Sequence, residues 1–249
     1  MKTYKKVLVT AIGLMAASVS HALPTVDVKF DKNIFEGSGY DDVTITASGS
    51  KPMSVYAGRF QGTASNVVGV PASIFVDSLN DLFMYCYDIF QEIKGGDSAK
   101  YTINLNGEMA RTLDFLGAVN TVLSVGKAYD PFAWLHPANG FQGAAIQLGI
   151  WESKYETQAA WSLSDGSFKA SGLEAGQAKT LQWWNKFSAA IATSDSLDGK
   201  YVMVLENAKV QDMITGDPLP VPEPGVLALF GVGIGGPLFA RRRKASLPA

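Results

Sequence analysis

Two residues with the potential for chemistry stand out in this chain of 249 residues, Cys86 and Gln147. Cys86 is the single cysteine, so in an oxidising compartment it is left with intermolecular pairing, a free thiol or other chemistry. Gln147 lies in a stretch with helical periodicity, where Gly143, Gln147 and Trp151 share one face. Another backbone can approach closely at Gly143, and the Trp151 indole can shield the carboxamide from water. A glutamine on such a face is unusual if it only contacts solvent.

The sequences around both residues resemble a known family. Cys86 lies in the aromatic segment Tyr85-Cys86-Tyr87, and the segment Gln147-Leu148-Gly149-Ile150-Trp151 follows later in the chain. These segments resemble the thioester domains of bacterial surface adhesins, in which an aromatic-Cys motif precedes a Gln-x-x-Ile-Trp motif. Ile146 and Gly149 depart from the Thr and the Ala that are usual at these positions.

The resemblance implies an internal thioester, formed with loss of ammonia when Cys86 attacks the amide carbon of Gln147. A Lys amine of a target then attacks the acyl carbon, which gives a lasting isopeptide bond to a surface. Such a thioester persists only where water is scarce and donors hold the carbonyl. Because the bond forms once, we expect no turnover enzyme. The sequence has no zinc-ligand spacing, and we expect no cofactor and no metal. The residues expected to line the thioester pocket are Tyr85, Tyr87, Gly143 and Trp151.

A second interpretation needs no covalent chemistry. Cys86 is then an inert buried thiol, and the protein is a structural or carbohydrate-binding component of an extracellular polysaccharide matrix. Glu152 and Glu156 share a helix face, but like charges at this spacing are usually solvated, so a catalytic carboxylate pair is disfavoured. The residues that could stack on sugars are Trp134, Trp161, Trp183 and Trp184, although Trp184 also fits a core stripe.

Hydrophobic periodicity predicts an α+β fold, a sandwich-like or barrel-like β-strand framework with an inserted set of about three helices. Strands are expected within 23–50 and over 55–60, 82–90, 101–105 and 201–206. The 82–90 strand should be central, because it is apolar on both faces. Helices are expected over 108–125, from Asn139 or Gly140 to about Tyr155, and over 173–193. Residues 65–75 read as a loop, and 161–168 as a strand pair or a loop.

The N-terminus has the pattern of a secretory signal peptide. Lys2, Lys5 and Lys6 precede the short apolar run 7–19, and small residues then lead to a predicted cleavage between Ala22 and Leu23. This pattern implies the Sec export machinery and signal peptidase as partners. It separates a signal peptide, 1–22, from an extracellular thioester-domain-like body, 23–215.

The C-terminus has three parts in a fixed order. A Pro-rich linker, 216–224, ends in Val221-Pro222-Glu223-Pro224 and is followed by an uncharged apolar run, 225–240, and by a basic tail, 241–249, that begins with Arg241, Arg242, Arg243 and Lys244. An uncharged helix can lie in hydrocarbon, and the cations favour the cytoplasmic side. The charges alone also fit a simple tail anchor.

This order resembles the PEP-CTERM sorting signals that exosortases of Gram-negative bacteria process. The resemblance implies exosortase as a partner, transient residence in the inner membrane through a single membrane helix, and delivery to the cell surface or extracellular matrix. The target would be a surface amine or a polysaccharide.

The composition agrees with export. The net charge is −2 over the full chain, and much of the positive charge lies in the two terminal segments, so the body between them is more acidic than the total. An acidic body argues against nucleic acid as a partner. Charged residues make up only 18% of the chain, which suits an exported β-containing protein better than a cytosolic enzyme.

Overall fold

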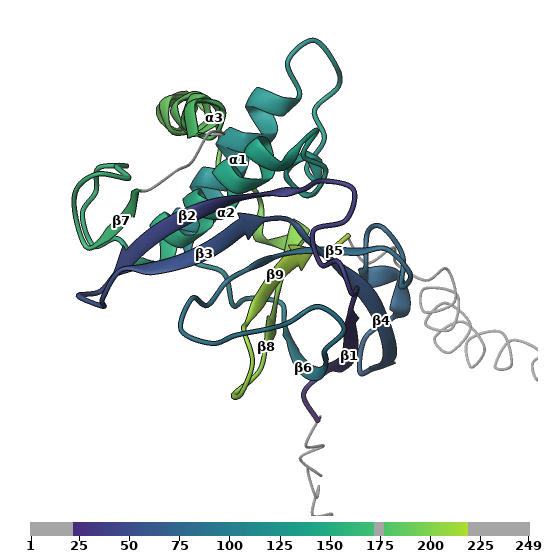
Figure 1. The fold of residues 1–249 in the computed structure, drawn as a ribbon. Coiled ribbons are helices and arrows are strands. Elements are labelled where there is room, and N and C mark those ends of the chain that lie inside the picture. Colours follow the sequence, from purple (N-terminus) through teal and green to yellow (C-terminus); the bar gives the residue numbers. More distant parts are fainter. Residues whose placement is uncertain (1–21, 172–176, 219–249) are drawn as a thin grey trace, which may run out of the picture.

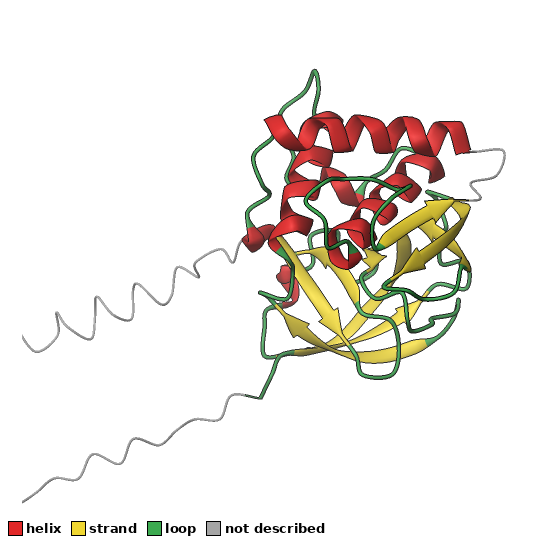
Figure 2. Cartoon of the chain, turned by 90° about the vertical axis from the view of Figure 1, so that its left-hand side faces the viewer, coloured by secondary structure: helices red, strands yellow, loops and turns green. Residues whose placement is uncertain are grey.

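The chain folds into a β-strand framework with a group of helices packed over one side of it (Figures 1 and 2). The computed structural model describes residues 22–171 and 177–218. The helices are inserted between strands in the chain order, as expected for an α+β fold. The framework consists of a closed barrel and a smaller open sheet.

Six strands form the barrel in the order β1-β4-β5-β9-β8-β6, and every neighbouring pair is antiparallel. Successive side chains of a strand point to opposite faces of the barrel wall. In β1, Val26, Val28 and Phe30 are buried, whereas Lys29, between Val28 and Phe30, is exposed. The barrel strands are β1 (Thr25–Phe30), β4 (Phe60–Val68), β5 (Leu82–Cys86), β6 (Ser98–Asn104), β8 (Val202–Glu206) and β9 (Met213–Gly216).

A three-stranded antiparallel sheet lies beside the barrel and packs against the helices, in the order β3 (Met53–Gly58), β2 (Tyr40–Ala47) and β7 (Phe168–Ser171). Three helices follow β6 in the chain: α1 (Ala110–Leu123), α2 (Gly140–Tyr155) and α3 (Gln177–Ala190). Among the described residues, no helix is both long enough and apolar enough to cross a membrane.

Helix α2 is the central element of the helical layer and contacts α1, α3, β2 and β3. Asn139 caps its start by accepting a hydrogen bond from the Gln142 N–H at 3.1 Å. Most of its residues are buried on every face, as in helices that lie inside a core. Two glycines allow this burial: a Cβ on Gly140 would lie 2.8 Å from the Tyr40 backbone nitrogen, and one on Gly149 would overlap the Phe115 ring.

Several boundaries differ from those expected. The buried strand β5 ends at Cys86 and does not reach 90, because the Asp88 carboxylate accepts the Phe90 N–H at 2.8 Å and turns the chain. The expected loop 65–75 begins with the last residues of β4. Residues 161–167 contain no strand, and β7 begins only at Phe168. The expected start of the third helix, at 173, lies outside the described residues.

Candidate functional site: a buried carboxamide on the Cys86 backbone

Cys86 and Gln147 meet in the core. Cys86 is the last residue of β5, and Gln147 lies in the middle of α2. The Cys86 N–H donates a hydrogen bond to Gln147 Oε1 at 2.9 Å, and Gln147 Nε2 donates one to the Cys86 carbonyl oxygen at 2.7 Å. Both side chains are fully buried. The structure therefore brings together the two residues that the sequence paired, through the backbone of one and the side chain of the other.

The path of the backbone explains why Gln147 can occupy this position. On one side, β5 pairs with β9, and the Tyr87 N–H bonds the Asp212 carbonyl oxygen. The Cys86 N–H and C=O therefore face the other side, where β4 pairs with β5 only as far as Phe60 opposite Met84. Since the next strand position is vacant there, the Gln147 carboxamide satisfies the two backbone groups that would otherwise be buried without partners.

The Cys86 thiol is held in an apolar and partly charged surrounding. Its S–H donates to the Asp88 carbonyl oxygen at 2.8 Å. Burial raises the pKa of the thiol well above its usual value, although the Trp151 indole N–H and the Lys154 ammonium act in the opposite direction. The thiol is therefore protonated in the folded protein near neutral pH.

Trp151 adds a second polar group beside the thiol. The indole N–H lies close enough to Cys86 to lower the pKa of the thiol, but it makes no hydrogen bond of normal geometry to any described residue. The Trp151 side chain is 2% exposed, and Nε1 is buried. A buried donor without a partner is uncommon and needs an explanation. Here it is an unused donor next to the sulfur.

The two tyrosines that flank Cys86 bind elsewhere with their hydroxyl groups. Tyr85 donates to the Trp134 carbonyl oxygen at 3.1 Å and stacks on the Trp134 ring. The Tyr87 oxygen accepts the Met109 N–H at 3.0 Å. Both contacts fasten β5 to the segments before and after α1. The tyrosines thus hold Cys86 in place, and their role in a thioester pocket stays a prediction.

Gly143 is less constrained than the sequence suggested. A Cβ on Gly143 would lie 3.5 Å from the backbone nitrogen of Arg59 and 3.5 Å from Pro137 Cγ. Both distances are ordinary van der Waals contacts. The close approaches on this helix occur instead at Gly140 and Gly149. Space for a side chain therefore exists at Gly143.

Sequence reasoning missed several polar groups around the thiol. Lys154 places its ammonium 3.9 Å above the Tyr87 ring, and burial lowers the pKa of this lysine. The Asp88 carboxylate accepts the Tyr155 O–H at 3.1 Å. Spacing could have identified Lys154, because it lies two helical turns after Gln147 on the same face. Asp88 could not have been found in this way, since its position depends on where β5 ends.

Glu152 in α2 and Glu156 at the C-cap of this helix are not solvated, contrary to expectation. Glu152 is fully buried, lies 3.6 Å from the Arg111 guanidinium and accepts the Ser162 N–H; burial raises its pKa to about 7. Although burial opposes it, hydrogen bonds from the backbone N–H groups of Gln158 and Phe168 and from other donors lower the pKa of Glu156 to about 2. Both carboxyl groups tie the 156–168 loop to the helix.

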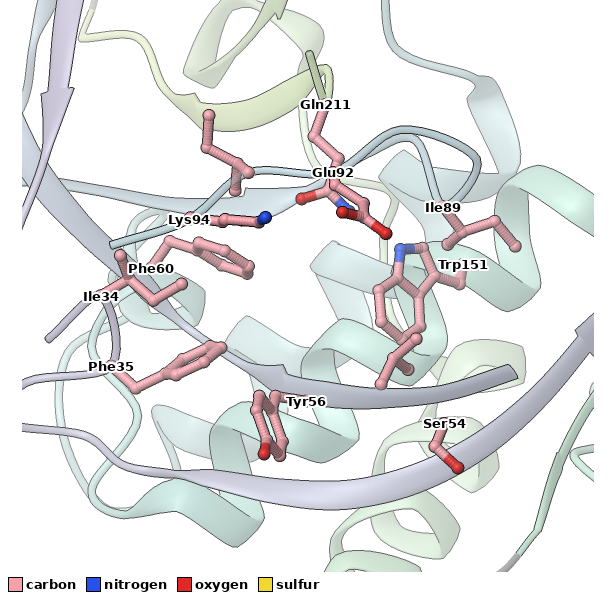
Figure 3. Close-up of a pocket in the computed structure, with 12 residues that line it drawn as sticks. Ile34, Phe35, Ser54, Tyr56, Phe60, Ile89, Glu92, Lys94, Trp151 and Gln211 are labelled. Atoms are coloured by element: carbon pink, nitrogen blue, oxygen red, sulfur yellow. The ribbon is translucent and has the colours of Figure 1, made fainter. Parts of the chain in front are cut away.

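A pocket of about 340 Å³ opens beside this site, with Trp151 at one end. Figure 3 shows the indole facing Phe35, Phe60 and Tyr56 across the pocket, with Glu92 on the side of the indole nitrogen. The pocket therefore connects solvent to the indole that borders Cys86. Among the described residues, no group of three His, Cys, Asp or Glu side chains could hold a metal ion.

One comparison with known proteins identifies the class of tail that this chain carries. Residues 220–244 match the PEP-CTERM protein-sorting motif. This match supports an exported protein that is processed by an exosortase and passes through the membrane before display at the cell surface. Searches of curated proteins and of solved structures gave no match.

The targeting segments lie largely outside the described residues. This applies to the signal peptide up to residue 21, to Val221–Pro224, to the membrane helix expected at 225–240 and to Arg241–Lys244. Ala22 and Leu23 are described and exposed, in a segment without regular secondary structure ahead of β1. A cleavage between them stays a prediction.

Proposed function

We propose that this exosortase-sorted protein forms an internal thioester between Cys86 and Gln147 and uses it once, to attach covalently to an amine-bearing target. The observation that carries the proposal is the buried Gln147 carboxamide, held by hydrogen bonds to both backbone groups of Cys86. This arrangement satisfies the Cys86 backbone and also places the carboxamide directly against the single cysteine of the chain.

The hydrogen bonds suit the chemistry of thioester formation. The Cys86 sulfur attacks Cδ of Gln147, a C–S bond forms, the C–N bond breaks, and ammonia leaves with the thiol proton. The Cys86 N–H already points at Oε1, the atom on which negative charge develops in the tetrahedral intermediate. The unused Trp151 N–H is a second donor beside the reacting sulfur.

Burial suits both the timing and the survival of the bond. Because burial raises the pKa of the thiol, the reactive thiolate is more accessible while the chain is still folding. Once the core has closed, the Cys86 and Gln147 side chains are fully buried and water is excluded from them. A thioester between them is then protected from hydrolysis. The product is a stored acyl group and not a site of turnover.

A non-covalent matrix role is the second candidate. It is favoured by one observation, the exposed aromatic side chains of Tyr40 and Tyr56, whose ring centroids lie 4.6 Å apart. Of the tryptophans considered for sugar stacking, Trp134 and Trp184 are buried, and Trp161 and Trp183 are half-buried.

The test is reaction with methylamine followed by peptide mapping. We expect a methylamide at Gln147, together with one Cys86 thiol that becomes available to an alkylating reagent. The Cys86→Ala variant should take up no methylamine, and the exposed Gln158 is the internal control. Rapid alkylation of Cys86 in the untreated native protein would overturn the proposal.

A further inference from the structure

Four aromatic rings lead from the surface into the pocket beside Trp151. Tyr40 and Tyr56 are 46% and 57% exposed, on the neighbouring strands β2 and β3. The Phe35 centroid lies 5.0 Å from that of Tyr40 and 4.9 Å from that of Phe60. Phe35 and Phe60 are buried. A pair of adjacent exposed aromatic rings that continues into a pocket is typical of a binding surface.

The pocket combines this aromatic wall with a few polar groups. Its volume is about 340 Å³, and Glu92, Lys94 and Gln211 line it together with Trp151 and Tyr56. Figure 3 shows Glu92 and Gln211 between Lys94 and Trp151, opposite the phenylalanine rings. Pockets of this kind, mainly apolar with a small number of placed polar groups, hold small organic groups in a defined orientation.

These features select the chemistry of the ligand. The exposed Tyr56 ring offers a flat aromatic face that fits the C–H face of a sugar ring, while Gln211 and Lys94 can bind ring hydroxyl groups. The Glu92 carboxylate can pair with an ammonium group. A lysine side chain offers an ammonium group but no ring to cover the aromatic wall. A pyranose that carries a primary amine meets both requirements.

We propose that this pocket binds an amino-sugar residue of a polysaccharide beside Trp151, which lines the pocket and borders the fully buried Cys86, and that displacement of this indole brings the amine to the Cys86–Gln147 thioester. Binding in the pocket follows from the aromatic wall and Glu92 alone, and only the covalent step rests on the proposed function. In that step the amine nitrogen attacks the acyl carbon of Gln147, a C–N bond forms and the C–S bond breaks. The Cys86 sulfur leaves and takes up the proton that the amine loses.

The experiment measures binding of a chitosan oligosaccharide to the full-length protein by calorimetry. The same measurement on the Cys86→Ala variant isolates non-covalent binding, because this variant cannot form a thioester. We expect Tyr56→Ala to weaken binding roughly tenfold through loss of stacking, and Glu92→Gln to weaken it roughly fivefold through loss of the ion pair. Two matched controls, Tyr129→Ala and Asp195→Asn, change exposed side chains outside the pocket and should leave binding unchanged.

Two further ligands decide the specificity. The fully N-acetylated oligosaccharide keeps the rings but has no amine, and a lysine-containing peptide has an amine but no ring. We expect both to bind more weakly than chitosan. Tighter binding of the peptide, equal binding of the acetylated sugar, or insensitivity to Tyr56→Ala and Glu92→Gln would overturn the inference.

A measurement of covalent attachment distinguishes failure of the pocket assignment from failure of the proposed thioester. Mass spectrometry should find the oligosaccharide attached at Gln147 in the wild-type protein. If no thioester forms but chitosan still binds Cys86→Ala through Tyr56 and Glu92, the proposed function fails and the pocket assignment stands. If a thioester forms but the pocket variants bind normally, the pocket assignment fails.

Discussion

The Gln147 carboxamide bonds both the N–H and the C=O of Cys86, at the position where a neighbouring strand would have continued the barrel. One side chain thus completes the hydrogen bonding of β5 and lies directly against the residue that carries the only thiol of the chain. Under the proposed function, stability and thioester formation depend on the same two hydrogen bonds, and substitutions are needed to separate them.

The contribution of these hydrogen bonds to stability can be measured without the thioester. In a Cys86→Ala background, Gln147→Met keeps the side-chain length but leaves two buried backbone groups without partners. We expect the free energy of unfolding to fall by about 2–4 kcal/mol, as measured by urea denaturation. The exposed Gln158→Met is the control. An unchanged denaturation midpoint would show that the carboxamide is not held as described.

The Trp151 indole N–H should assist thioester formation. Trp151→Phe removes this donor and keeps an aromatic ring, so we expect thioester formation to slow by about tenfold, with the Cys86 N–H still present as a donor. The readout is the fraction of freshly folded protein that lacks one ammonia, followed by mass spectrometry over time. Trp183→Phe, on α3, is the control. Equal rates in both variants would exclude a role for the indole.

Two glycines of α2 should respond in opposite ways to the same substitution. Gly149→Ala places a methyl group against the Phe115 ring, and we expect it to lower the free energy of unfolding by about 2–3 kcal/mol. Gly143→Ala has room for its methyl group and should be neutral or stabilise the helix by up to about 1 kcal/mol. Thermal denaturation of the two variants checks this order, and a loss of stability only in Gly143→Ala would contradict it.

Stability should fall as the pH rises through neutrality. Burial raises the pKa of Glu152 from 4.5 to about 7, so the unfolded chain releases this proton at a lower pH than the folded protein does. The stabilising effect is complete below about pH 4.5 and is lost as the pH rises through about 7. We expect Glu152→Gln to remove about 1–2 kcal/mol of the difference in unfolding free energy between about pH 5 and about pH 8.

Asp217 should also lower the free energy of unfolding as the pH rises, since burial raises the pKa of this carboxyl group to about 7 as well. The Asp217→Asn variant therefore serves as a comparison, and each substitution should flatten the pH profile in part. A pH profile of Glu152→Gln that is identical to that of the wild-type protein would contradict a Glu152 pKa that burial raises.

Much of the fold followed from periodicity, and the exceptions have physical reasons. Helix α2 was expected from Asn139 or Gly140 to Tyr155, close to its observed bounds, because a cap residue precedes a long periodic stretch. Strand β9 was not expected, since its four residues are too few to show alternation and are buried on both faces. Its position beside β5 is nevertheless what directs the Cys86 backbone toward Gln147.

From the sequence, only the two residues of the candidate site could be predicted, and not the contacts between them. The single cysteine and the mid-helix glutamine could be paired because a family resemblance joined them. The hydrogen bonds through the Cys86 backbone could not be predicted, because they depend on where β4 stops pairing with β5. The burial of Glu152 was also inaccessible, since it depends on the loop that carries Ser162 folding back onto the helix.

The most direct test of the central claim is the intact mass of the natively purified, exported protein, kept free of amines. We predict a mass that is lower by one ammonia than the mass calculated for the processed chain, and no such deficit in Cys86→Ala or in Gln147→Ala. Wild-type protein without this deficit, with a free Cys86 thiol after unfolding, would contradict the proposed thioester.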